Sequence, residues 1–212
     1  MTGGLPRIWI ITDPGHPDGP VTPIRRALEG CSPGLVGVQL RAKGASDRQL
    51  VEWGRALRSL TRAAGCELTV NRRVDLAEIV GADGAHLPER GLPSPEVRRQ
   101  WPKLAMIGVS RHDRQGLREA AKDEASYAFL SPIFEVPGKA SPIGIEGFGR
   151  AIAHVGIPTY ALGGIGPEHL CGLITAGAVG VAICRAIYEA SQPAEVLQRF
   201  SRALDKALAK GG

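Results

Sequence analysis

The sequence of 212 residues predicts an α/β fold, a single (β/α)8 TIM barrel that spans residues 1–212. Three observations support this prediction. Short apolar runs recur along the chain, segments with helical spacing separate them, and no linker or shift in composition marks a second domain. Near-continuous apolar runs are typical of parallel strands that are buried on both faces. Because strands and helices alternate without interruption, a closed barrel is the predicted architecture.

Eight runs are each too short for a helix and rich in aliphatic or β-branched residues. These predicted strands cover residues 7–12, 35–40, 67–71, 84–87, 104–110, 127–131, 159–163 and 179–183. The composition fits a globular protein, with 43% hydrophobic and 22% charged residues. Since only 5% of the residues are aromatic, we expect an aliphatic core.

The clearest predicted helix covers residues 46–64, where apolar residues recur at spacings of three and four. Ser46 suits its N-cap and Gly65 its end. Pro167 and Pro193 are typical of the first turn of a helix. Further helices are predicted over residues 74–80, 94–101, 114–122, 145–154, 167–175 and 193–210, with a weaker one over 23–29.

A doubly wound open sheet is the rival fold, because it also alternates strands and helices. A dinucleotide-binding sheet would typically show a GxGxxG turn after its first strand. Here the first strand runs into Thr12-Asp13-Pro14-Gly15, which lacks that pattern. The 28 glycines and 16 prolines show no G-X-Y period, so a collagen-like chain is excluded.

The net charge of +5 favours anionic ligands, but the basic residues are scattered along the chain. We therefore expect neither nucleic acid nor a membrane as a partner.

The four cysteines (Cys31, Cys66, Cys171 and Cys184) form no CxxC motif, which favours small buried side chains in a reducing compartment. With no signal-peptide pattern and no apolar run of membrane-spanning length, a cytoplasmic protein is expected.

In a barrel of this kind the site lies at the carboxyl ends of the strands. Cations, amides and hydroxyls are predicted to meet there, and a glycine turn after strand seven and a helix start after strand eight add backbone N–H groups. A phosphorylated small molecule is the ligand class that this pattern favours. The candidate binding residues are Gln39, Arg41, Lys43, Asn71, Ser110, Lys139, Gly163, Gly164, Cys184 and Arg185.

His112 is the candidate acid/base, since a histidine titrates near neutral pH. The alternative is an ordinary exposed loop histidine. His86 alternates inward on strand four and suits a barrel-interior position. The sequence has no HxH, HExxH or Cys/His cluster, which argues against a transition-metal site, and no GxSxG motif.

Along nearly its whole length the chain resembles the thiamine-phosphate synthase / TenI-like thiazole tautomerase superfamily. The resemblance implies a (β/α)8 barrel that acts in the assembly of the thiazole–pyrimidine skeleton of thiamine. It also implies that two copies of the chain can pair as a homodimer. The matching segments cover residues 11–13, 38–43, 71–77, 81–87, 107–112, 131–135, 161–165 and 177–183.

The synthase branch joins a pyrimidine pyrophosphate to a thiazole phosphate, with Mg²⁺ bridging the pyrophosphate. That branch typically has Asn-Asp after strand three and Gly-Gln-x-Asp after strand four. This chain has Asn71-Arg72 and Pro88-Glu89-Arg90-Gly91, so both expected metal carboxylates are replaced. An arginine repels Mg²⁺, and only Glu89 or Asp13 remain to rebuild a site.

The tautomerase branch also lacks those carboxylates and, like this chain, has a Ser-x-His arrangement after strand five. The resemblance to that branch implies His112 as acid/base in a metal-independent proton shift on a carboxythiazole phosphate. Gly163, Gly164 and the Cys184-Arg185 turn would hold the phosphate. Arg41 and Lys43, with Lys139, would hold the carboxylate.

The resemblance therefore favours a thiazole tautomerase, an isomerase that needs no cofactor. A thiamine-phosphate synthase, a transferase with an altered Mg²⁺ site, is the first alternative. The second is a non-catalytic regulator that binds thiazole or thiamine phosphates. Whether Arg72, Arg73 and Arg111 line the site is left open by the sequence.

Overall fold

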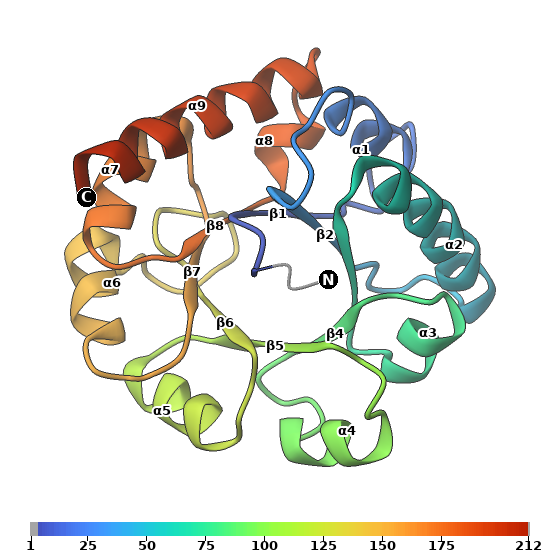
Figure 1. The fold of residues 1–212 in the computed structure, drawn as a ribbon, viewed down its shortest axis with the longest axis horizontal. Helices are drawn as coiled ribbons and strands as arrows, with labels where there is room; N and C mark the ends of the chain where they lie inside the picture. Colours follow the sequence, from blue (N-terminus) through green and yellow to red (C-terminus); the bar gives the residue numbers. More distant parts are fainter. Residues whose placement is uncertain (1–3, 212) are drawn as a thin grey trace.

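Eight parallel strands close into a barrel in the computed structural model, which describes residues 4–211 (Figure 1). Each strand pairs with its neighbours in sequence, and β1 also pairs with β8 to close the ring. The strands are β1 (Ile8–Ile11), β2 (Val36–Leu40), β3 (Glu67–Asn71), β4 (Gly84–Leu87), β5 (Met106–Arg111), β6 (Tyr127–Leu130), β7 (Thr159–Leu162) and β8 (Gly180–Ile183). The predicted (β/α)8 barrel is confirmed, and the open-sheet alternative is wrong.

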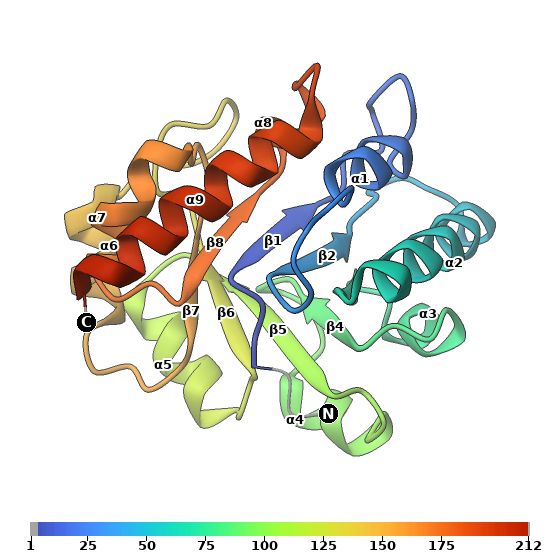
Figure 2. The same cartoon turned by 45° about the horizontal axis from the view of Figure 1, so that its top comes forward.

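Helices form the outer layer around the strands (Figures 1 and 2). They are α1 (Thr22–Ala27), α2 (Asp47–Ala64), α3 (Val74–Ile79), α4 (Ser94–Gln100), α5 (Arg114–Lys122), α6 (Gly144–Ile152), α7 (Leu170–Thr175), α8 (Arg185–Tyr188) and α9 (Pro193–Gly211). The predicted ends of α2 are confirmed. Ser46 and Gln49 form a capping box, and Gly65 ends the helix with a left-handed φ of 65°.

Two helical segments differ from the prediction. Pro167 begins a 3-10 turn, η1 (Pro167–His169), and the α-helix starts only at Leu170. The His169 side chain accepts a hydrogen bond from the Gly166 backbone N–H at 2.9 Å, which stabilises this tight turn. The helix after β8 is the single turn α8, so its dipole is small compared with that of a long helix.

Aromatic residues fill much of the barrel interior, contrary to the expected aliphatic core. Trp9 stacks on Tyr127 with ring centroids 5.2 Å apart, and Phe129 and Tyr160 pack edge-on against Trp9. The aliphatic cluster lies instead between the strands and the helices. Gly108 makes room for this filling, because a Cβ there would lie 2.2 Å from Tyr127 Cζ.

Within residues 4–211, none of the helices has the length and apolar character that crossing a membrane requires.

Candidate functional site

Gln39 is the last inward residue of β2, and its side chain is almost completely buried, with 1% exposed. Its Nε2 has no hydrogen-bond partner within the described chain. A buried amide N–H without an acceptor is costly, so this group is suited to donate to a ligand. Binding of substrate by Gln39 stays a prediction.

Arg41 follows β2 and is held by Thr12 at the end of β1. The Thr12 hydroxyl donates to the Arg41 carbonyl at 3.0 Å and accepts from the Arg41 N–H at 2.8 Å. Thr12 is buried, so this pair of hydrogen bonds fixes the backbone from which the half-buried Arg41 side chain projects. Sequence reasoning assigned Thr12 no role, because its partner lies on another strand.

His86 lies inside the barrel beneath Ser110. Its Nε2 is 2.9 Å from Ser110 Oγ, and its Nδ1 is 3.4 Å from the Tyr127 hydroxyl. Burial, together with the positive charges of Arg111 and Arg41, lowers the pKa of His86 to about 3. His86 is therefore neutral near pH 7 and orients Ser110, which confirms its predicted interior position.

His112 follows β5 and has an exposed side chain. Its Nδ1 is 2.6 Å from the Ser131 carbonyl oxygen. Because a carbonyl oxygen only accepts, Nδ1 carries the hydrogen, and in the neutral ring Nε2 is the acceptor. The ring is thus anchored at one nitrogen, and the other is available for proton transfer.

A cavity of about 340 Å³ lies at the carboxyl ends of β7 and β8. Four predicted residues line it: Gly163, Gly164, Cys184 and Arg185. The wall also includes Glu189, an acidic residue that sequence reasoning did not place there. Burial, followed by the charge of Asp13, raises the pKa of the Cys184 thiol to about 11. Cys184 is therefore a neutral part of the wall at physiological pH.

The backbone after β7 requires glycine. Gly163 has a φ of 109° and Gly164 a φ of 66°, both in the region that glycine favours. A Cβ on Gly164 would lie 2.8 Å from Phe134 Cβ and 3.0 Å from the Glu135 carbonyl oxygen. This close approach explains the two successive glycines and leaves the exposed Gly164 backbone at the edge of the cavity.

The other predicted binding residues lie at the same end of the barrel but outside this cavity wall. Asn71 is half-buried at the end of β3, while Lys43 and Lys139 are exposed. Lys139 belongs to the long loop between β6 and α6. The cavity wall comes from the ends of β7 and β8, from α8 and from Val136 of that same loop, and neither lysine is part of it.

The three arginines left open by the sequence differ in their contacts. Arg73 is paired with Asp47 and Asp75. Arg111 donates two hydrogen bonds, from Nε to the Gly116 carbonyl at 3.0 Å and from a terminal nitrogen to the Ser110 carbonyl at 2.8 Å. Arg72 is exposed, has a left-handed φ of 69°, and makes no side-chain hydrogen bond or ion pair to residues 4–211. Arg72 is thus the arginine of this set that remains available to a ligand.

The residues at the mouth do not fit a Mg²⁺ site. Among the described residues, no group of three or more His, Cys, Asp or Glu side chains could hold a metal. Asp13 accepts a hydrogen bond from the Gly15 N–H at 2.9 Å, and Glu89 is exposed. Mg²⁺ needs hard oxygen ligands in near-octahedral geometry, and the free guanidinium of Arg72 offers none.

The molecule is thus a (β/α)8 barrel with a glycine-lined cavity and basic side chains at the carboxyl end of its strands. The family model described as thiamine monophosphate synthase matches residues 8–187. The chain belongs to this thiamine monophosphate synthase family, as the resemblance implied.

Two similar relatives are named thiamine-phosphate synthase. The protein from Moorella thermoacetica is 39% identical over 190 residues, which cover 88% of this chain and 89% of the relative. The protein from Chloroflexus aurantiacus is 38% identical over 189 residues, covering 87% and 86%. A solved structure, thiamine phosphate pyrophosphorylase from Pyrococcus furiosus, superposes with a TM-score of 0.86 at 31% identity, covering 95% of this chain and 96% of that one.

These comparisons support an enzyme of thiamine biosynthesis. The names of the relatives favour the synthase alternative over the tautomerase that the sequence favoured, and they give no specific support to the tautomerase branch.

Proposed function

We propose that this chain is a thiamine-phosphate synthase, which joins a pyrimidine pyrophosphate to a thiazole phosphate and releases pyrophosphate. The observation that carries the proposal is the presence of two separate regions suited to anions. One is the cavity at β7 and β8 with Gly164 and Arg185. The other comprises Arg41, Lys43 and Arg72 after β2 and β3. Two phosphorylated substrates need two such regions, and the names of the relatives support the same reaction.

In this reaction a bond forms between the thiazole nitrogen and the methylene carbon of the pyrimidine, while the bond from that carbon to the pyrophosphate oxygen breaks. We assign the thiazole phosphate to the cavity at β7 and β8. The charge that develops on the leaving pyrophosphate is then neutralised by Arg41, Lys43 and Arg72. Positive groups placed at a developing negative charge lower the barrier. The residues present do not fit Mg²⁺, so these basic side chains supply the neutralising charge.

The test supplies the purified chain with both substrates and measures thiamine phosphate and pyrophosphate together, with and without EDTA. We expect equal amounts of the two products, and we expect release of pyrophosphate to persist in EDTA. Arg72→Gln should lower kcat/KM for the pyrophosphate substrate, while Arg48→Gln, on the exposed surface of α2, is the matched control. Absence of both products at high enzyme concentration would end the proposal.

Thiazole tautomerisation is the second candidate, and His112 is the observation that favours it. Because Nδ1 of His112 is anchored, Nε2 is able to take a proton from one atom of the thiazole ring and return it to another atom of that ring. A positioned acid/base contributes roughly 10²–10⁴-fold. Conversion of carboxythiazole phosphate by the wild type, with a loss of that size in His112→Ala, would favour this function.

Tight binding of the thiazole phosphate without turnover in either assay would instead indicate a regulator.

A further inference from the structure

Cys31 and Cys66 lie together on the face of the barrel opposite the mouth. Their Sγ atoms are 3.5 Å apart, although the residues are 35 positions apart in the chain. Cys31 lies in the loop between α1 and β2, and Cys66 directly precedes β3. Because both cysteines come before parallel strands, the pair lies at the amino-terminal end of the barrel and takes no part in the site described above.

The backbone around the two cysteines holds them close. The Gly34 N–H, three residues after Cys31, donates to the Gly65 carbonyl, next to Cys66, at 2.8 Å. Pro33 packs against Gly65, where a Cβ would come within 2.9 Å of the proline ring. The two loops are thus in direct contact, and the approach of the sulfur atoms is built into the fold.

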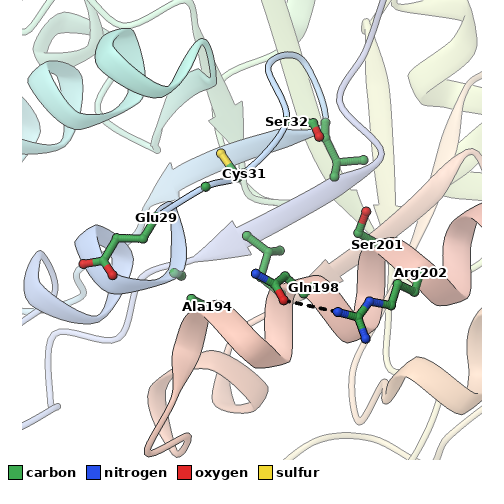
Figure 3. Close-up of a pocket in the computed structure, with 11 residues that line it drawn as sticks. Glu29, Cys31, Ser32, Ala194, Gln198, Ser201 and Arg202 are labelled. Carbon is green, nitrogen blue, oxygen red and sulfur yellow. Dashed lines mark hydrogen bonds between the residues drawn. The ribbon is translucent and has the colours of Figure 1, made fainter.

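A second cavity, of about 270 Å³, lies next to Cys31. It lies between α9 and the segment that joins α1 to β2, and Cys31 lies at its edge (Figure 3). Polar residues line much of it, including Glu29, Gln198 and Arg202, the last two joined by a hydrogen bond of 3.4 Å. A small polar molecule can therefore enter next to Cys31.

The two thiols differ in exposure. Cys31 is half-buried, whereas Cys66 is buried with 4% of its surface exposed. Burial, followed by the proximity of Cys31, raises the pKa of the Cys66 thiol to about 12. Reactive cysteines are those that are accessible and can ionise. Cys31 is therefore the thiol expected to react first, and Cys66 is positioned to react with it afterwards.

We propose that Cys31 and Cys66 form a redox-active modification site that closes to a disulfide when a small hydroperoxide, such as hydrogen peroxide, enters the neighbouring cavity. Cys31 loses its thiol proton, its sulfur attacks one oxygen of hydrogen peroxide and the O–O bond breaks. The leaving hydroxide takes up that proton as the first water molecule, and Cys31 becomes a sulfenic acid. The Cys66 sulfur then attacks the Cys31 sulfur, the S–O bond breaks, and water leaves with the Cys66 proton. Two thiols are oxidised to one disulfide, and the peroxide is reduced to two water molecules.

The disulfide would tie the loop before β2 to the loop before β3. A cross-link between residues this far apart restricts the unfolded chain and stabilises the fold. The mouth lies at the other end of the strands, so we expect oxidation to raise resistance to urea while leaving substrate binding at the mouth unchanged.

The test treats the full chain with hydrogen peroxide and maps thiols and disulfides by mass spectrometry of its peptides. We expect a Cys31–Cys66 linkage within one molecule, reversible by dithiothreitol, while the exposed Cys171 has no partner cysteine beside it in residues 4–211. Cys171→Ser is the matched control and should still form the linkage. Cys66→Ser should accumulate a Cys31 sulfenic acid that a dimedone probe labels.

A second measurement keeps the proposal testable if Cys66→Ser does not fold. The midpoint of urea unfolding should rise on oxidation of the wild type, return on reduction, and stay constant in peroxide-treated Cys31→Ser. The proposal is overturned if Cys31 and Cys66 are recovered as free thiols after Cys171 has been oxidised, or if the linkages found join different molecules.

Discussion

Replacing Gly164 by alanine tests the assignment of the cavity at β7 and β8 as the phosphate site. Alanine at a φ of 66° costs about 1–2 kcal/mol. Its Cβ would also lie 2.8 Å from Phe134 Cβ and 3.0 Å from the Glu135 carbonyl oxygen, so the turn must move. If that movement removes one backbone N–H from the phosphate, the charge-assisted hydrogen bond lost is worth about 1.5–3 kcal/mol. The dissociation constant of the thiazole phosphate should then rise roughly 10- to 140-fold.

Isothermal titration with the thiazole phosphate measures this change, and urea unfolding measures stability in parallel. Gly156→Ala is the matched control, because Gly156 has a φ of 73° and an added Cβ there would meet no atom within 4 Å. The control should lose a similar amount of stability from backbone strain alone and keep its affinity. A folded Gly164→Ala variant with wild-type affinity would refute the placement of the phosphate.

Three further predictions follow from contacts elsewhere in the barrel. Thr12→Val removes both hydrogen bonds to the Arg41 backbone, so kcat/KM should fall about tenfold, and urea unfolding should show a loss of stability of about 1–3 kcal/mol. Burial, followed by a hydrogen bond that protonated Glu67 donates to the Asp83 carboxylate, raises the pKa of Glu67 from 4.5 to about 7. The folded state therefore binds the proton more tightly, and its stability should fall by about 1 kcal/mol, after solvent screening, as pH rises from 4.5 to 7. Urea unfolding at both pH values checks this, and a fall of the same size in Glu67→Gln would contradict it. Gly108→Ala forces a Cβ to 2.2 Å from Tyr127 Cζ and should cost about 1–3 kcal/mol in the same assay, whereas Gly149→Ala, with its nearest contact at 3.6 Å, should be tolerated.

The periodicity of the sequence was sufficient to predict the barrel. Apolar runs identified all eight strands, because parallel strands buried on both faces carry a strong local signal. The ends of α2 were predictable for the same reason, since Ser46 and Gly65 act through neighbouring residues. Features that depend on contacts between strands could not be predicted from the sequence. The aromatic interior is an example, because Trp9 and Tyr127 meet only after the ring has closed.

The positions of the candidate residues in the fold were predictable to a similar extent. The rule that barrel sites lie at the carboxyl ends of strands brought Gly163, Gly164, Cys184 and Arg185 to one cavity. The rule gives no side-chain direction, so it could not separate the paired Arg73 from the free Arg72. It also gave no reason to connect Cys31 with Cys66, whose contact depends on two loops of different strand–helix units.

The most direct test of the central claim is a single reaction that contains the chain, the pyrimidine pyrophosphate and the thiazole phosphate, with thiamine phosphate and pyrophosphate measured together. The proposed function predicts that both products accumulate in equal amounts and continue to do so in EDTA. The proposed function would be contradicted if the chain formed neither product but converted carboxythiazole phosphate to its tautomer. The site would then be that of a tautomerase with His112 as its acid/base.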